Sequence, residues 1–354
     1  VFSLTVDDAV AALKVIGGSD KADPFSRDRP LAEMSAFPRK LRLGIPRNGQ
    51  LIFFGDKHSE KAYGEAIKRW TSLGAEPVEF DLEPFYETAR LLYEGPWVAE
   101  RYLAIRSLLA SSPDALHPVT RKIILDGARP TAVDTFAAYY ELEELRRVRD
   151  AIFAGIDALL LPTAPTVYTV QQVLADPIQL NSRLGTYTNF VNLLDLCGLA
   201  LPAAMRSDGV PSGITLLAPG GQDAFLASIG RVFHADTALP LGALKLAPPP
   251  LAALGAVPAP DEIALAVVGA HLSGLPLNHE LRNLGARLLQ ATSTAPDYKL
   301  FALAGGEPRR PGMLRVAAGQ GSAIALETWA MSAEAFGRFV ANVPPPLSIG
   351  TLKL

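Results

Sequence analysis

Segments in which apolar residues recur every three or four positions alternate along this chain with short, continuous apolar runs. The helical spacing predicts helices at residues 5–16, 59–73, 84–93, 96–109 and 135–153, and the apolar runs predict strands at 41–46, 77–80 and 158–161. Thr5 and Asp8 have capping-box spacing, and Gly17-Gly18 ends the first helix. The alternation predicts an α/β protein in which helices cover a sheet.

A proline-rich stretch interrupts this pattern after residue 239. Proline cannot continue a helix or a strand ladder, so residues 246–260 are predicted to form a semi-rigid linker. We therefore expect one domain at residues 1–245 and a second, smaller one at 261–354. Strands are predicted in the second domain at residues 263–268, 298–302, 312–317 and 323–327.

Composition narrows the class of protein. With 49% apolar and 19% charged residues over 354 positions, the chain has the balance of a globular protein. The formal net charge of -3 gives no electrostatic footprint for nucleic acid or a membrane surface, and no apolar run is long enough to span a bilayer. The single cysteine, Cys197, cannot form an internal disulfide, which favours the cytoplasm. Because the chain starts Val1-Phe2 without methionine, we expect it to be an internal fragment.

Common motifs for metals and nucleotides do not occur in the sequence. It contains no Cys-x-x-Cys, His-Glu-x-x-His or Walker-type loop, and no Gly-x-Gly-x-x-Gly before a helix. We therefore expect neither a metal nor a cofactor. His58, His117 and His234 stand without partner motifs and are expected to be structural.

The segment Tyr93–Tyr102 reads Tyr-Glu-Gly-Pro-Trp-Val-Ala-Glu-Arg-Tyr. Its Gly-Pro pair should end one helix and begin the next, which would bring Tyr93 and Arg101 to either side of a bend. An arginine fork and a phenol hydroxyl suit a small carboxylate. The alternative is a surface arginine paired with Glu94 or Glu100.

Residues 185–192 combine glycine with hydroxyl and amide side chains before an apolar stretch that is predicted to be a helix. Such residues could line a polar pocket. Helix capping by Thr188 or Asn189 explains the pattern equally well.

In the second domain, a histidine follows a predicted buried strand. His271 lies in a Gly-Ala-His-Leu-Ser-Gly loop, where an imidazole could act as a base near neutral pH. His279 is a second candidate, and Glu327 is a weaker acid or base candidate on a later strand. A structural histidine remains the alternative.

Several segments of the chain resemble known families. The run Ala-Leu-Leu-Leu-Pro-Thr-Ala-Pro from residue 158 and the Gly-Thr-Tyr-Thr-Asn-Phe-Val-Asn-Leu-Leu-Asp segment from residue 185 resemble the distal half of an amidase signature hydrolase. With the motif at 93–102 and the domain at 261–354, the chain is similar to allophanate hydrolases. The loop at His271 also resembles γ-glutamyl cyclotransferase-like domains, but Gly-Ala-His-Leu replaces Tyr-Gly-Ser-Leu, which argues against cyclotransferase activity.

The resemblance implies a fold and a chemistry. It implies the distal part of an amidase-signature mixed sheet followed by an α+β domain, and hydrolysis of allophanate to ammonia and carbon dioxide in urea degradation. Tyr93 and Arg101 would hold the substrate carboxylate, and His271 would promote decarboxylation of the product. The family's serine, second serine and lysine match no stretch here, so the isolated chain is expected to be inactive.

The resemblance also implies functional coupling to a urea carboxylase, and it is compatible with a homodimer. Two alternatives stay open at this point. The chain could belong to another amidase signature hydrolase or an amidotransferase A-type subunit, or it could be a catalytically inert scaffold or interaction fragment.

Overall fold

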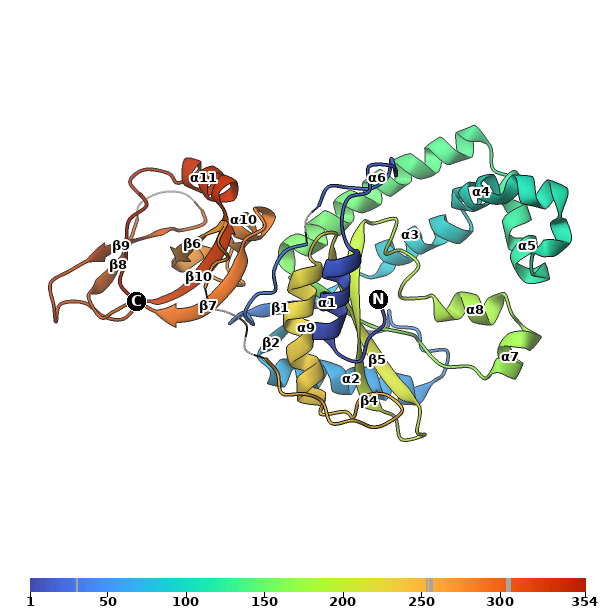
Figure 1. The fold of residues 1–354 in the computed structure, drawn as a ribbon, viewed down its shortest axis with the longest axis horizontal. Coiled ribbons are helices and arrows are strands. Elements are labelled where there is room, and N and C mark those ends of the chain that lie inside the picture. The colour runs from blue at the N-terminus through green and yellow to red at the C-terminus, as the bar shows by residue number, and fades with distance from the viewer. Residues whose placement is uncertain (30, 253, 255–256, 304–306) are drawn as a thin grey trace. The chain divides into compact units, whose positions relative to one another are not determined.

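The structure is a computed structural model that describes residues 1–29, 31–252, 254, 257–303 and 307–354. Contacts divide the chain into two compact units, whose elements Figure 1 colours by residue number. One unit contains residues 43–69 and 77–220, and the other contains residues 1–42, 70–76 and 221–354. Each unit therefore combines segments that lie far apart in the sequence.

A five-stranded sheet has the strand order β2-β1-β3-β5-β4. Its strands are β1 (Leu41–Pro46), β2 (Ala75–Phe80), β3 (Ala158–Pro162), β4 (Leu196–Met205) and β5 (Pro211–Pro219). The sheet is mixed, because β1 pairs with β3 in parallel whereas β5 pairs antiparallel with both β3 and β4. Every residue of β3 is buried, as expected for an apolar run in a strand covered on both faces.

Helices occupy much of the sequence between these strands: α2 (Lys57–Ser72), α3 (Glu83–Tyr93), α4 (Trp97–Ser111), α5 (Pro118–Leu125), α6 (Ala132–Gly155), α7 (Val170–Ala175) and α8 (Gln179–Leu184). The longest, α6, begins at Ala132 because Thr131 and Asp134 form a capping box. Each of these two side chains accepts a hydrogen bond from the other residue's backbone N–H. Within the described residues, no helix combines the length and the apolar character needed to cross a membrane.

The core of the unit that contains residues 43–69 and 77–220 lies where α3 and α6 pack on the sheet. Phe85 of α3, Leu142 of α6 and Leu159 of β3 belong to one buried cluster. Phe85 also meets Phe190 edge to face, with ring centroids 5.1 Å apart and planes at 70°. This packing holds α3 in place up to its last residue, Tyr93.

In the other unit, α1 (Val6–Ile16) and α9 (Asp223–Thr237) lie side by side (Figure 1). The carboxylate of Asp7 accepts hydrogen bonds from Arg231 at 2.6 and 2.7 Å. Arg231 is buried, and this carboxylate balances the charge of its guanidinium. Trp70 stacks on Phe233 with ring centroids 4.7 Å apart. One ion pair and one aromatic pair thus fix segments more than 150 residues apart.

The C-terminal part of that unit has α+β architecture. Its antiparallel sheet has the order β6-β10-β7, and β8 pairs with β9 in a separate two-stranded sheet. Leu265, Leu281, Trp329 and Phe339 form its core. The elements are β6 (Glu262–Val267), α10 (Asn278–Asn283), β7 (Arg287–Ser293), β8 (Tyr298–Ala302), β9 (Pro311–Arg315), β10 (Ala325–Ser332) and α11 (Ala333–Ala341).

The sequence patterns predicted some elements closely and missed others. The strands predicted at 41–46 and 298–302 are β1 and β8, and the mixed sheet with covering helices is confirmed. The apolar helix predicted after residue 192 is wrong, because β4 begins at Leu196 and pairs along β5. The strand predicted at 323–327 overlaps only the start of β10, and β5, β7 and α9 were not predicted.

The division into domains at residues 245 and 261 stays a prediction. Residues 253, 255 and 256 of the predicted linker lie outside the described residues. Before them, Leu241 and Leu246 form an isolated antiparallel bridge, and the carbonyl of Ala252 accepts a hydrogen bond from Arg231 at 2.9 Å. The described part of the linker is therefore partly fastened to α9.

Candidate functional site

Tyr93 and Arg101 lie on either side of the turn between α3 and α4. The turn requires glycine at position 95, since a Cβ there would lie 2.4 Å from the Leu91 carbonyl oxygen. Pro96 then precedes α4 as its N-cap residue, and its φ of -74° suits a helix start. The Arg101 guanidinium carbon lies 5.0 Å from the centroid of the Tyr93 ring, a cation–π distance. Two residues eight positions apart are thus in contact.

Next to this turn is a cavity of about 480 Å³. Its wall includes Tyr86, Arg90 and Tyr93 from α3, and Ser182, Thr186 and Asn189 from the segment that follows α7. Arg101 is not among the lining residues. The structure therefore places Tyr93 on the cavity wall and Arg101 against the ring of Tyr93.

Another part of the cavity wall, which includes Gln50 and Ile52, is held by hydrogen bonds from phenol groups. Tyr187 donates to the carbonyl of Ile52 at 2.9 Å and accepts from its N–H at 2.8 Å, and Tyr86 donates to the carbonyl of Gln50 at 3.0 Å. Burial raises the pKa of Tyr187 to about 12, although the bond from Ile52 opposes this. These phenols therefore stay protonated at neutral pH and serve as braces.

The segment 185–192 forms turns rather than the start of a helix. Helix capping by Thr188 or Asn189 is therefore wrong, because the strand β4 follows. Asn189 instead packs against Gly185, where a Cβ would lie 2.4 Å from the amide oxygen. Thr186 donates to the carbonyl of Arg183 at 2.6 Å. Thr186 and Asn189 consequently contribute polar groups to the cavity wall.

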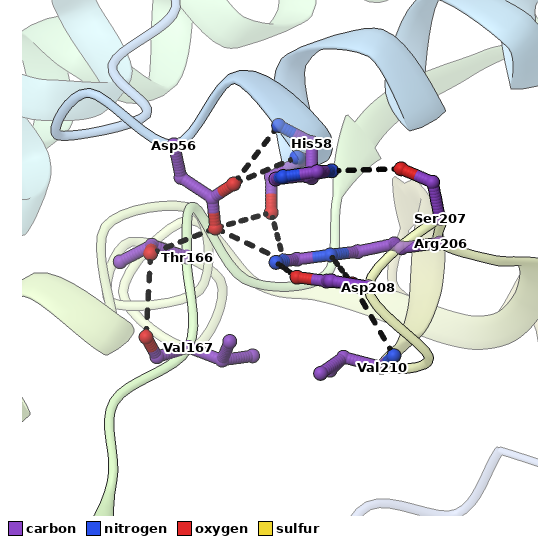
Figure 2. Close-up of polar contacts among 9 residues, drawn as sticks. Asp56, His58, Thr166, Val167, Arg206, Ser207, Asp208 and Val210 are labelled. Carbon is purple, nitrogen blue, oxygen red and sulfur yellow. Dashed lines mark hydrogen bonds and ion pairs between the residues drawn. The ribbon is translucent and has the colours of Figure 1, made fainter.

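A second polar cluster, centred on Asp56 and Arg206, lies in the same unit (Figure 2). Arg206 donates to Asp56 at 2.9 Å and to Ser59 at 2.9 Å, and its guanidinium forms a forked pair with Asp208. The carboxylate of Asp56 also accepts from Thr166 at 2.9 Å. The side chains of Asp56 and Arg206 are only 11% and 5% exposed, so this is a buried ion pair.

The cluster shifts the pKa of both carboxyls. Burial alone would raise the pKa of Asp56, but hydrogen bonds from Ser59 and Thr166, with the charge of Arg206, outweigh it and lower this pKa. The hydrogen bond from Arg206 lowers the pKa of Asp208 to about 2. The arrangement joins the start of α2, the loop after β3 and the turn between β4 and β5, and so has a structural role.

Figure 2 also shows a histidine–serine contact in this cluster. His58 Nδ1 lies 3.0 Å from Ser207 Oγ. Among the described residues, no carboxylate is hydrogen-bonded to the other ring nitrogen, so the pair lacks the third member of a hydrolytic relay. Sequence reasoning missed the cluster because its members are 110 and 150 positions apart.

His271 lies at the end of a 3₁₀ turn, Gly269–His271, that follows β6. Its Nε2 is 2.9 Å from Oε2 of Glu280, and its ring meets that of Phe339 edge to face at 5.2 Å. The side chain is 18% exposed. His279, by contrast, is hydrogen-bonded through Nδ1 to the carbonyl of Pro276. Of the two, His271 is the one held by a carboxylate.

Glu327, the weaker acid or base candidate, is buried beneath the same loop. Its Oε2 accepts hydrogen bonds from the N–H and hydroxyl of Ser273 at 2.8 and 3.0 Å, and from Trp329 Nε1 at 3.2 Å. Burial raises the pKa of Glu327, and these hydrogen bonds oppose the rise. Glu327 therefore anchors the loop that carries His271. Within the described part of the chain, no three His, Cys, Asp or Glu side chains are grouped to hold a metal.

Comparison with known proteins divides the chain in two. Residues 1–226 match the family model described as Amidase, and residues 263–354 match the model described as Allophanate hydrolase C-terminal domain. Urea amidolyases of Lachancea kluyveri and Saccharomyces cerevisiae are each 37% identical over 100% of this chain. The chain spans 20% of the length of either relative.

Solved structures agree with this division. An allophanate hydrolase of Kluyveromyces lactis matches 99% of this chain with 37% identity and a TM-score of 0.72, and the match covers 59% of that chain. The A-type component of the glutamyl-tRNA(Gln) amidotransferase from Thermotoga maritima matches 70% of this chain and 55% of its own, with a TM-score of 0.53 and 17% identity, which indicates a shared fold alone. The expected fold, an amidase-type sheet followed by a further domain, is confirmed.

Proposed function

The chain belongs to the amidase family, and on that premise we propose that it is part of an allophanate hydrolase. Such an enzyme cleaves the amide of allophanate to ammonia and a carboxylated carbamate, which then loses carbon dioxide. One observation carries the proposal: an amidase portion is followed in the same chain by a match to the allophanate hydrolase C-terminal domain. We place the domains at 1–245 and 261–354, with a linker at 246–260.

Other amidases and amidotransferase A-type subunits are less favoured. A glutamyl-tRNA(Gln) amidotransferase component of this type, from Myxococcus xanthus, matches only 66% of this chain, with 31% identity. The urea amidolyases match all of it. An inert scaffold would not require a polar cavity beside an arginine fork, and the cavity supports a binding role.

In this proposal Tyr93 and Arg101 bind the substrate carboxylate. A guanidinium presents two parallel N–H donors to a carboxylate, and the Tyr93 hydroxyl adds a third donor from the cavity wall. The π-face of Tyr93 already holds the Arg101 guanidinium at 5.0 Å, which reduces the conformational entropy lost on binding. Tyr93 is 47% exposed, so the ligand reaches it from solvent.

The hydrolytic step needs groups that the sequence of this chain does not supply. In the family mechanism an activated serine attacks the amide carbonyl, the C–N bond breaks and ammonia leaves with the transferred proton. Backbone N–H groups stabilise the oxyanion, and water then releases the acid from the acyl-enzyme. We propose that this chain contributes substrate anchoring and the later decarboxylation, in which His271 transfers the proton.

The relatives named urea amidolyase support functional coupling to a urea carboxylase that would deliver allophanate. The single cysteine supports the cytoplasm as the location. A homodimer stays a prediction.

The experiment is to supply allophanate to the full-length protein and follow ammonia and carbon dioxide separately. We expect both products from allophanate, and little turnover of simple amides or of glutaminyl transfer substrates. His271→Ala should leave the first ammonia release nearly intact and slow carbon dioxide formation, most clearly at alkaline pH where spontaneous decarboxylation is slower. Absence of ammonia release from allophanate in the unmodified protein would refute the proposal.

A further inference from the structure

The imidazole of His271 is held by a carboxylate that has no role in the function proposed above. Glu280 lies in α10, and its Oε2 is 2.9 Å from His271 Nε2. An ionised carboxylate can only accept hydrogen bonds, so Nε2 must carry the proton that is shared with it. We infer that Glu280 is the positioning residue of His271, holding the ring with Nε2–H toward itself and Nδ1 toward the reacting molecule.

The backbone around this pair is fixed independently of the side chains. Leu277 N–H donates to the carbonyl of Ala270 at 2.9 Å, and the Asn278 side-chain amide donates to the carbonyl of His271 at 2.9 Å. These two bonds tie the start of α10 to the 3₁₀ turn. Glu280 therefore reaches the imidazole from a helix whose first turn is anchored to the histidine's own backbone.

Two further contacts restrict the imidazole and its carboxylate partner. Phe339 packs edge to face on it at 5.2 Å, and Arg310 lies 3.9 Å from the second oxygen of Glu280. Among the described residues, no hydrogen bond is formed to Nδ1 of His271. The side chain is 18% exposed and Nε2 is occupied by Glu280, so we assign Nδ1 as the nitrogen that faces a ligand.

The inference rests on the proposed function for its chemistry. In the decarboxylation, an imidazolium would donate its Nδ1 proton to the nitrogen of the carboxylated carbamate. The N–C bond breaks, its electron pair stays on nitrogen, and the carboxylate leaves as carbon dioxide. Glu280 would face the positive charge of the imidazolium from the other side of the ring and would not touch the substrate.

The test uses two substitutions of Glu280 and a control. Glu280→Leu removes the acceptor, Glu280→Gln keeps an acceptor oxygen without the charge, and Glu334→Gln changes an exposed glutamate of α11. In the ¹⁵N-histidine-labelled chain, with the signal assigned by His271→Asn, the Nε2–H resonance should persist in the unmodified protein, in Glu280→Gln and in the control. It should be lost to solvent exchange in Glu280→Leu.

In the full-length enzyme, Glu280→Leu should lower kcat for carbon dioxide formation about tenfold, with KM within about twofold, because a positioning residue acts on the proton donor. Glu280→Gln should restore part of the loss, and the first ammonia release should not change. If the Nε2–H signal survives Glu280→Leu, or if carbon dioxide formation depends on His271 but not on Glu280, the inference is wrong. If His271→Ala itself changes nothing, the proposed decarboxylation fails instead, whatever the spectrum shows.

Discussion

Arg101→Leu is the substitution that most directly tests substrate anchoring. The substitution removes a charge-assisted, bidentate hydrogen bond to the substrate carboxylate. In a fully buried site, the loss of such a bond would cost about 2–4 kcal/mol of transition-state binding. Arg101 is only partly buried, which places the expectation in the lower half of this range. We therefore expect kcat/KM for allophanate to fall about 30- to 150-fold, since each 1.4 kcal/mol is tenfold.

One further variant isolates the contribution of the Tyr93 hydroxyl, and another serves as a control for losing an arginine from α4. Tyr93→Phe keeps the ring that supports the guanidinium but removes the hydroxyl, so kcat/KM should fall only about 2- to 10-fold. Arg106→Leu removes an exposed arginine from the same helix, α4, and should have no effect. Melting curves of all three variants should match that of the unmodified protein, because none of these side chains belongs to the buried core.

The assay compares allophanate with biuret, in which a neutral carboxamide replaces the carboxylate. Arg101→Leu should reduce the preference for allophanate while leaving biuret turnover nearly as it was, because only the charged substrate uses the guanidinium. A kcat/KM within twofold of the unmodified enzyme would remove Arg101 from the site. An equal loss on both substrates would mean that the residue supports the fold of the turn rather than the carboxylate.

Two other predictions concern the chain as a whole. The isolated chain of residues 1–354 should release no ammonia from allophanate above a buffer blank, because its sequence lacks the loop that carries the family's nucleophilic serine. Measurable ammonia release that Arg101→Leu abolishes would show that a nucleophile lies within this chain. Arg206→Met should lower the free energy of unfolding by about 3–5 kcal/mol at pH 7, because it leaves Asp56 buried and without its cation. Because the pKa of Asp56 is lowered and that of Asp208 is lowered to about 2, the stabilisation is present above about pH 4 and is lost as pH falls toward 2. Urea titrations of the unmodified protein and of Arg206→Met should therefore converge near pH 2. A difference in stability that stays constant with pH would contradict the ion-pair account.

Local sequence signals predicted the parts of this fold that depend on local interactions. The glycine-proline turn at 95–96 and the buried run of β3 follow from steric and hydrophobic rules that act over a few residues. The strand β4 was mistaken for a helix because an apolar stretch alone does not distinguish the two. Its partner β5 decides the outcome, and pairing between strands cannot be read from either strand by itself.

For the candidate sites too, residues close in sequence could be paired, but partners distant in sequence could not. Tyr93 and Arg101 could be paired from the sequence because one turn of chain joins them, whereas Asn189 reaches the cavity that Tyr93 lines only through tertiary packing. His271 was recognisable from its glycine-rich loop, but Glu327, buried on β10, holds that loop from 54 residues away. A side chain's chemistry is thus suggested by its neighbours in sequence, and its orientation is set by partners that only the folded chain brings to it. For this chain the reactive groups were therefore easier to name than the residues that position them, and the positioning residues are where variants with intact folds and altered rates should be sought.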